Sequence, residues 1–170
     1  MQELTEQLLL LAGRDEQWKV ELKEVNIAQI ATELVRSFQN AYHRKINLQI
    51  EDDGFVIVDP QKFKQLFYIL MDNAQKYSEE SIDVVIRREQ KKVSVEICDR
   101  GIGIPTDQLD KIFDRFYRVD QARARKTGGF GLGLSLAKEI AEVIGAELQI
   151  ESTEGIGTKV KIMLFTANPH

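Results

Sequence analysis

An aspartate at residue 99 ends an alternating apolar stretch, and this position suits a chemical role for its carboxylate. The apolar residues of KVSVEICD alternate from Val93 to Ile97, and Asp99 falls on the same face of the predicted strand. A carboxylate there is costly unless it is hydrogen-bonded, and a neutral donor such as an exocyclic amine satisfies it without adding charge. The alternative is that the strand ends earlier and residues 99–101 form only a turn. The spacing leaves both interpretations open.

A second group lies in MDNAQKYS. Asn73, Lys76 and Tyr77 are spaced i, i+3 and i+4, so they share one side of a helix. An amide oxygen can join a Mg²⁺ shell that phosphates and waters complete, a lysine can contact a phosphate, and a tyrosine can cover a flat base. Taken by itself, this pattern is better explained by an ordinary helix end with a surface Asn and Lys.

Glycines and basic residues are concentrated between Cys98 and Ile140, which hold six of the eleven glycines of the chain. Residues 100–130 carry seven Lys or Arg against four Asp, within a chain of net charge −4. Gly131 and Gly133 open a predicted helix, whose free N–H groups can meet phosphate oxygens. No Gly-Lys-Ser/Thr follows, and no strand precedes the glycines, so neither a Walker A loop nor a dinucleotide fingerprint is present. This basic island indicates a small polyanionic ligand, although a solvated surface loop has the same composition.

The elements that must position these residues follow from periodicity and capping signals. Asn26 is a predicted N-cap for a helix whose apolar face is formed by Ile27, Ile30, Leu34, Phe38 and Ala41. Asp59-Pro60 predicts the start of a second helix, and Gly145 the end of a third. The further expected elements are a hairpin over 45–60 turning at Asp53-Gly54, strands over 81–88 and 91–99, a helix over 132–144, and strands over 147–153 and 159–165.

Short turns join adjacent strands, which predicts an α/β fold with a mixed, mostly antiparallel sheet and helices on one face. The 170 residues suit one domain, and 43% hydrophobic with 29% charged residues is ordinary for a globular protein. The negative net charge argues against a general nucleic-acid surface. Cys98 is a lone cysteine, so no disulfide framework exists and a reducing compartment fits. No targeting peptide is visible, and no apolar run is long enough to span a bilayer.

The order of these motifs resembles that of the catalytic, ATP-binding domain of bacterial sensor histidine kinases, of the GHKL (Bergerat-fold) superfamily. DNAQKYS resembles the asparagine box of that family, DRGIGI its first glycine box, and IFDRFYR its phenylalanine box. GGFGLGLSLAKEI resembles the second glycine box, and GIGT the short glycine motif near the end. The resemblance covers roughly residues 18–165.

The resemblance implies a two-layer α/β sandwich, with three helices on one face of the sheet and a mobile lid over ATP. Asp99 would bind the adenine amine and Asn73 would coordinate Mg²⁺. Lys76 and Arg118 would contact phosphates, and Tyr77 would lie against the base. Phe113 and Phe116 would hold the lid against the body. The other residues that it places at ATP are Gly101, Gly103, Ile104, Gly129, Gly131, Leu132, Gly133, Leu134 and Thr158.

The leading segment MQELTEQLLLLAGRDE looks like the end of a dimerisation helix, and a helix that folds back onto its own domain is the alternative. On the first interpretation we expect residues 1–17 to be that remnant with a linker, 18–165 the kinase domain, and 166–170 a tail. The implied partners are the histidine-bearing dimerisation domain of a parent kinase, which would be a homodimer, and a response regulator receiver domain. The isolated chain would be monomeric. A cytoplasmic location, on a membrane-bound sensor, goes with this assignment.

Two positions depart from the pattern of the family. Ile69 stands where many members carry an Asn four residues before the metal-binding Asn, and Phe130 stands where a small residue is usual. The only histidines are His43 and His170, and neither lies in a segment like the phosphoacceptor motif of the family. We therefore expect this chain to bind ATP without phosphorylating itself.

Two rival functions stay open. An ATP hydrolase of the wider superfamily would use a Glu at the position of Ile69 to activate water, and isoleucine cannot act as a base. A nucleotide-responsive binding module would regulate a partner without phosphoryl transfer. The presence of Asn73, Lys76 and Asp99 argues against a dead site but does not exclude such a module.

Overall fold

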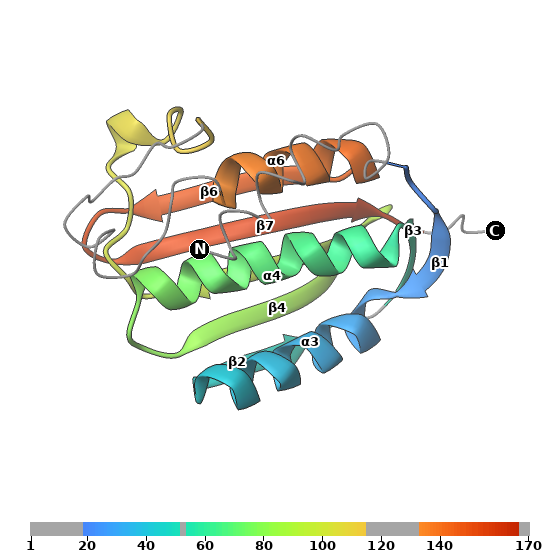
Figure 1. Cartoon of the computed structure of the whole chain (residues 1–170), viewed down its shortest axis with the longest axis horizontal. Helices are drawn as coiled ribbons and strands as arrows, with labels where there is room; N and C mark the ends of the chain where they lie inside the picture. The colour runs from blue at the N-terminus through green and yellow to red at the C-terminus, as the bar shows by residue number, and fades with distance from the viewer. Residues whose placement is uncertain (1–18, 52–53, 115–132, 167–170) are drawn as a thin grey trace.

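A single layer of helices covers one face of a mixed sheet. The computed structural model describes residues 19–51, 54–114 and 133–166. Within these residues, helices α3 (Ile27–Tyr42), α4 (Pro60–Tyr77) and α6 (Gly133–Ile144) lie side by side over a five-stranded sheet (Figure 1). This arrangement confirms the predicted two-layer α/β fold with three helices on one face.

The main sheet is mixed and mostly antiparallel, as predicted. Its strand order is β2-β4-β5-β7-β6, with β4 paired antiparallel to β5, β5 to β7 and β6 to β7. Only β2 and β4 run parallel among these pairs. The bounds are β2 Ile46–Ile50, β4 Ile82–Glu89, β5 Lys92–Asp99, β6 Glu147–Thr153 and β7 Gly157–Phe165.

The hairpin predicted to turn at Asp53-Gly54 is wrong. Strand β3 (Phe55–Val58) does not pair with β2 but with β1 (Lys23–Asn26), in a separate two-stranded antiparallel sheet. Val56 and Val58 of β3 are fully buried, whereas Phe55 and Ile57 are exposed. Because β2 instead pairs with β4, which lies more than thirty residues later, long-range packing overrides the local turn signal.

Capping residues start the first two helices where the sequence predicts. The Asn26 side chain accepts a 3.2 Å hydrogen bond from the Gln29 N–H at the start of α3. Asp59 Oδ1 accepts from the N–H groups of Gln61 (3.0 Å) and Lys62 (3.1 Å) at the start of α4. Both caps supply acceptors to N–H groups that a helix start leaves without partners.

The buried stripe of α3 is rotated relative to the prediction. Ile27 and Phe38 are buried as expected, and Ala41 is exposed. The remaining buried residues of the helix are Ala28, Ala31 and Val35, while Ile30 and Leu34 are only partly buried.

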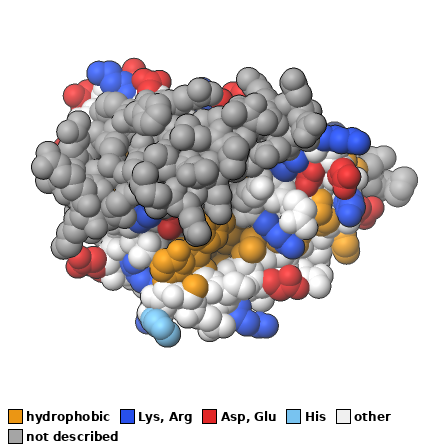
Figure 2. All heavy atoms as spheres, viewed as in Figure 1, with side chains coloured by type: hydrophobic (Ala, Val, Ile, Leu, Met, Phe, Trp, Pro, Cys, Tyr) orange, Lys and Arg blue, Asp and Glu red, His pale blue; other side chains and the backbone are white. Residues whose placement is uncertain are grey.

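Figure 2 shows hydrophobic side chains gathered on the helix-bearing face over α3 and α4. Tyr42 and Tyr68 are 39% and 50% exposed, and their hydroxyl oxygens are 3.0 Å apart.

The core lies between the helix layer and the sheet, with α4 at its centre. Phe63, Leu66, Phe67 and Leu70 of α4 are buried together with the alternating residues of β5 and with Leu136 and Ile140 of α6. Fully burying each such side chain contributes about 1.5–3 kcal/mol. The core thus fixes α4 and β5, which carry Asn73, Lys76, Tyr77 and Asp99 of the candidate site, relative to each other.

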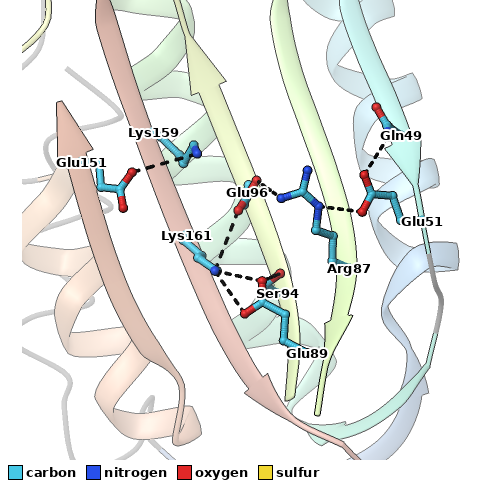
Figure 3. Close-up of polar contacts among 9 residues, drawn as sticks. All are labelled: Gln49, Glu51, Arg87, Glu89, Ser94, Glu96, Glu151, Lys159 and Lys161. Atoms are coloured by element: carbon cyan, nitrogen blue, oxygen red, sulfur yellow. Dashed lines mark hydrogen bonds and ion pairs between the residues drawn. The ribbon is translucent and has the colours of Figure 1, made fainter. Parts of the chain in front are cut away.

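Charged side chains cover the opposite face of the sheet. Glu96 of β5 is only 5% exposed there, and it lies between Arg87 (3.4 Å) and Lys161 (3.9 Å). Figure 3 shows that Arg87 also reaches Glu51 and that Lys161 also reaches Glu89. The network neutralises a nearly buried carboxylate and shields the central strand from water.

One end of the molecule collects four chain segments that are distant in sequence. The end of α4, the end of β5, the start of α6 and the turn between β6 and β7 all lie there (Figure 1). Among the described residues, those assigned to ATP lie in or beside these segments. Within the described residues, no helix is both long and apolar enough to cross a membrane.

Candidate functional site

The last turns of α4 carry three of the predicted site residues. Asn73, Lys76 and Tyr77 are all half-buried near the end of this helix. The Lys76 ammonium lies 3.0 Å from the Asp72 carboxylate, one helical turn earlier. This ion pair holds the lysine near the end of the helix, where a cation is also favoured by the helix dipole.

Asp99 is the last residue of β5 and is half-buried, so both interpretations of its position hold in part. It belongs to the strand, paired opposite Thr158 of β7, and its Oδ1 accepts a 2.9 Å hydrogen bond from the Gly101 N–H, as in a turn. Burial raises the pKa of the Asp99 carboxyl above its usual value of 3.8, although the N–H groups of Gly101 and Thr158 act to lower it. The carboxylate is thus partly removed from water, and hydrogen-bonded chiefly to neutral donors.

The main chain after Asp99 passes directly against the end of α4. The Ile102 N–H donates to the Tyr77 carbonyl oxygen at 3.3 Å. A Cβ atom at Gly101 would lie 2.0 Å from that oxygen and 3.0 Å from Asp99 Oδ1. Only glycine allows this approach, which places Asp99 next to the turn that carries Lys76 and Tyr77.

The same segment is also fixed to the turn between β6 and β7. Gly103 has a φ of 69°, and a Cβ atom there would lie 2.1 Å from the Thr153 carbonyl oxygen. Ile104, which is 8% exposed, donates its N–H to Ser152 Oγ at 2.8 Å. Ser152 Oγ is also 2.8 Å from Thr158 Oγ1. Predicted residues Gly103, Ile104 and Thr158 are therefore brought together, and Ser152 joins them without having been predicted.

Arg44 is the second residue that the sequence did not single out. It precedes β2 and donates hydrogen bonds to the carbonyl oxygens of Gln75 (3.1 Å), Ser78 (2.6 Å) and Glu80 (2.8 Å). Its guanidinium therefore lies at the C-terminal end of α4, on the chain segment that bears the candidate site. No sequence pattern distinguishes this arginine from the basic residues around it.

Helix α6 carries two of the remaining described residues of the predicted site and contacts a third, Phe113. It begins at Gly133, and a Cβ atom there would lie 3.6 Å from Ile69 Cγ2, so the unusual isoleucine faces the first turn of α6. Leu134 is half-buried and packs against the core. The ammonium group of Lys138, on α6, lies over the ring of Phe113, 5.6 Å from the centre of that ring. The predictions for Phe116, Arg118, Gly129, Phe130, Gly131 and Leu132 lie outside the described residues.

The residues present fit a magnesium nucleotide better than a metal held by protein alone. Within the described ranges, no group of three or more His, Cys, Asp or Glu side chains is placed to hold a metal ion. Mg²⁺ commonly takes one or two protein ligands and completes its shell with phosphates and waters. The Asn73 amide oxygen suits that role, and the Asp99 carboxylate suits a neutral N–H donor on a base.

Comparison with known proteins gives the family. Residues 58–168 match the family described as histidine kinase-, DNA gyrase B-, and HSP90-like ATPase. The chain is 40% identical over 169 residues to sensor histidine kinase YkoH of Bacillus subtilis, covering 99% of the chain and 37% of YkoH. It is 42% identical over 182 residues to sensor protein CiaH of Streptococcus pneumoniae, covering 98% of the chain and 39% of CiaH. The chain thus spans under two fifths of these relatives.

The fold is also similar to that of a solved protein structure. The structure resembles the catalytic domain of histidine kinase ThkA with a TM-score of 0.74 at 24% identity, over 86% of this chain and 96% of that one. At that identity the likeness concerns the fold alone, and the sequence matches supply the relationship. The chain therefore belongs to the histidine kinase-, DNA gyrase B-, and HSP90-like ATPase family, as an ATP-binding catalytic domain of the sensor histidine kinase type.

Proposed function

We propose that this domain binds ATP with Mg²⁺ and transfers the γ-phosphoryl group to a histidine on a dimerisation helix that this chain does not carry. The observation that carries the proposal is Asp99, a half-buried carboxylate beside the turn that carries Lys76 and Tyr77 and held by the Gly101 N–H. A carboxylate so placed can accept a hydrogen bond from the amine of adenine. That contact selects adenine over guanine, which has a carbonyl oxygen at the corresponding position.

The neighbouring residues take the roles that their chemistry permits. Tyr77 covers one side of the base, and the Asn73 amide oxygen is the protein ligand to the metal. A bound Mg²⁺ would neutralise charge on the phosphate oxygens, which complete its shell together with water. Lys76 and Arg118 contact phosphates, and the backbone from Gly131 to Leu134 approaches the triphosphate, where the N–H groups at the start of α6 favour negative charge.

The proposed acceptor is outside this chain because, among the described residues, neither His43 nor the position of Ile69 offers a nucleophile or a base. Phosphoryl transfer is chiefly positioning and charge stabilisation, so an aligned nucleophile is essential. His43 is exposed at the C-cap of α3, with a φ of 51°, where it serves to end the helix. Ile69 faces α6 and cannot orient water. Trace hydrolysis is therefore the expected activity of the chain alone.

The broader setting is part of the proposal. Residues 1–17 would be the end of a dimerisation helix with its linker, 18–165 the kinase domain, and 166–170 a tail. The parent kinase would be a homodimer that passes its phosphoryl group to a response regulator receiver domain. We place the domain in the cytoplasm, since ATP and an unpaired cysteine both suit a reducing compartment.

Phosphoryl transfer can be tested with γ-labelled ATP, the chain, and a separately produced histidine-bearing hairpin of the parent kinase. We expect acid-labile label on the hairpin, weakly because the covalent link that raises effective concentration is missing. The Asn73→Ala variant should give none. Release of free phosphate instead would indicate a hydrolase, and the absence of both products would indicate a binding module.

A further inference from the structure

We propose that Arg44 is a positioning residue for nucleotide binding, which fixes the last turn of α4 to the segment that precedes β2. The inference rests on the proposed function, because the Lys76 and Tyr77 side chains of that turn are assigned there to phosphate and base. Arg44 precedes β2, more than thirty residues away from this turn in sequence, and contacts it only in the folded protein.

The end of helix α4 explains what the arginine does. Its C-cap, Ser78, has extended backbone angles (φ −142°, ψ 159°), so no left-handed residue turns the chain back to satisfy the last carbonyl groups. Arg44 supplies the donors instead. Its Nη1 donates to Gln75 O at 3.1 Å, and its Nη2 donates to Ser78 O at 2.6 Å and Ser78 Oγ at 2.8 Å.

The guanidinium also anchors the chain that leaves the helix. Glu80 O accepts from Nη2 at 2.8 Å and from Nε at 3.1 Å. Ser78 is only 3% exposed, and its hydroxyl donates to Ala74 O at 2.7 Å. A planar fork that meets three main-chain carbonyls at once fixes direction as well as distance, and the positive charge at the helix C-terminus is favourable.

The turn is thereby held from two sides. Arg44 binds the carbonyl groups of Gln75 and Ser78, whereas the Tyr77 carbonyl accepts from the Ile102 N–H on the side of β5. Lys76 and Tyr77 lie between these attachments. Loss of the arginine would leave one side unattached, and the two side chains would no longer be held against the site before the nucleotide arrives.

The charge of Arg44 reaches the carboxylate of the site as well. Burial raises the pKa of Asp99, the N–H groups of Gly101 and Thr158 lower it, and the Arg44 charge lowers it further. The ionisable side chains nearest along the neighbouring elements include Lys76, which pairs with Asp72, and Tyr77, both on α4. They also include Cys98 on β5, Asp83 on β4, which pairs with Arg100, and Lys159 on β7, which pairs with Glu151. Arg44 thus favours the ionised form of Asp99, which can accept a hydrogen bond from the amine of adenine.

Two substitutions separate the effect of the hydrogen-bonding geometry of the guanidinium from the effect of its positive charge. Arg44→Lys keeps a positive charge but cannot span the three carbonyl groups, and Arg44→Gln removes both the charge and the fork. Arg36→Gln is the matched control, because Arg36 is exposed on α3. Each protein is melted by circular dichroism, and ADP with Mg²⁺ is titrated by calorimetry well below the melting temperature.

We expect ADP affinity to fall about tenfold in Arg44→Lys and further in Arg44→Gln, with Arg36→Gln unchanged. ADP affinity should also fall on acidification, as Asp99 is protonated. That fall should begin at higher pH in Arg44→Gln than in wild type, and near the wild-type pH in Arg44→Lys. The Asp99→Asn variant cannot titrate at residue 99, so the pH dependence of its ADP affinity serves as the baseline for protonation of the nucleotide itself. A purely structural arginine would lower the melting temperature without moving the pH profile.

Wild-type affinity in folded Arg44→Lys would overturn the inference, even if Arg44→Gln failed to fold. An unshifted pH profile in a folded Arg44→Gln would equally contradict it. Failure of the wild-type chain to bind ADP would contradict the proposed function instead, so the two failures are distinguishable.

Discussion

The backbone of Gly101 lies so close to the carbonyl oxygen of Tyr77 that a Cβ atom at residue 101 would fall 2.0 Å from it. This contact joins the segment after β5 to the end of α4. It is a main-chain contact on both sides, so neither partner can yield by changing a rotamer. The proximity of Asp99 to the Lys76 and Tyr77 turn therefore depends on the absence of a side chain at this position.

Substitution of Gly101 by alanine should separate these two segments. We expect Gly101→Ala to lower the free energy of unfolding by about 1–3 kcal/mol, as overpacking does, and to weaken ADP binding at least about tenfold. Urea unfolding and calorimetry measure the two effects. Gly54→Ala is the control, because a Cβ atom there would meet only Val93 Cγ2 at an ordinary 3.4 Å. If the Gly101→Ala variant were as stable as wild type, the backbone of residue 101 would not lie tightly against the Tyr77 carbonyl oxygen.

Asp99→Asn should make the nucleotide-free protein more stable at neutral pH. Burial raises the pKa of Asp99 above 3.8, so the folded protein binds a proton more tightly than the unfolded chain does. The stability contributed by this group is fully present below the unfolded pKa and is lost as pH rises through the folded pKa. The asparagine variant should therefore melt above wild type at pH 7, by a margin that shrinks toward pH 4. A lower melting temperature at pH 7 would contradict this.

Sequence patterns predicted the elements whose signals are local. Asp59-Pro60 marks the start of α4, and β4 and β5 form the predicted antiparallel pair, which ends at Asp99. The Asp53-Gly54 hairpin failed because β2 and β3 belong to different sheets, which a turn signal cannot detect. Arg44 and Ser152 were missed for a related reason: each contacts main-chain groups or side chains that only the fold brings near.

Asp59 should stabilise the protein both as a helix cap and through its charge. Asp59 Oδ2 accepts from the Glu21 N–H at 2.8 Å, in addition to its bonds at the start of α4. Burial acts to raise the pKa of Asp59, but the hydrogen bonds from Glu21, Lys62 and Gln61 and the Lys62 charge leave it lowered overall. Its contribution is thus present above the unfolded pKa near 3.8 and is lost as pH falls through the folded pKa.

Two variants separate these effects at Asp59. Asp59→Ala should lower the free energy of unfolding at pH 7 by about 1–2 kcal/mol, and Asp59→Asn by less, because asparagine still caps a helix. Urea titrations from pH 7 to pH 3 measure both variants. The difference between wild type and Asp59→Asn should narrow on acidification, and a constant difference would rule out a contribution from the charge.

On the charged face of the sheet, Lys161 should contribute more to the free energy of unfolding than Lys159 does. Lys161 contacts the nearly buried Glu96 at 3.9 Å and Glu89 at 3.0 Å. Lys159 forms an ion pair only with the exposed Glu151, at 4.0 Å, among the described residues. Lys161→Ala should therefore cost about 1–3 kcal/mol of unfolding free energy, and Lys159→Ala at most about 0.5 kcal/mol. Equal effects in urea titrations would show that burial of Glu96 does not matter to stability.

The most direct test of the account is a calorimetric titration of ADP into the wild-type chain and into Asp99→Asn. Asparagine keeps the shape of the side chain but can present a donor where the adenine amine needs an acceptor. A buried polar group left without its partner costs about 1–3 kcal/mol, which corresponds to roughly ten- to a hundredfold in affinity. The account predicts that Asp99→Asn stays folded and binds ADP weaker by that factor. Equal affinity of the two proteins would remove Asp99 from the nucleotide site and contradict the account.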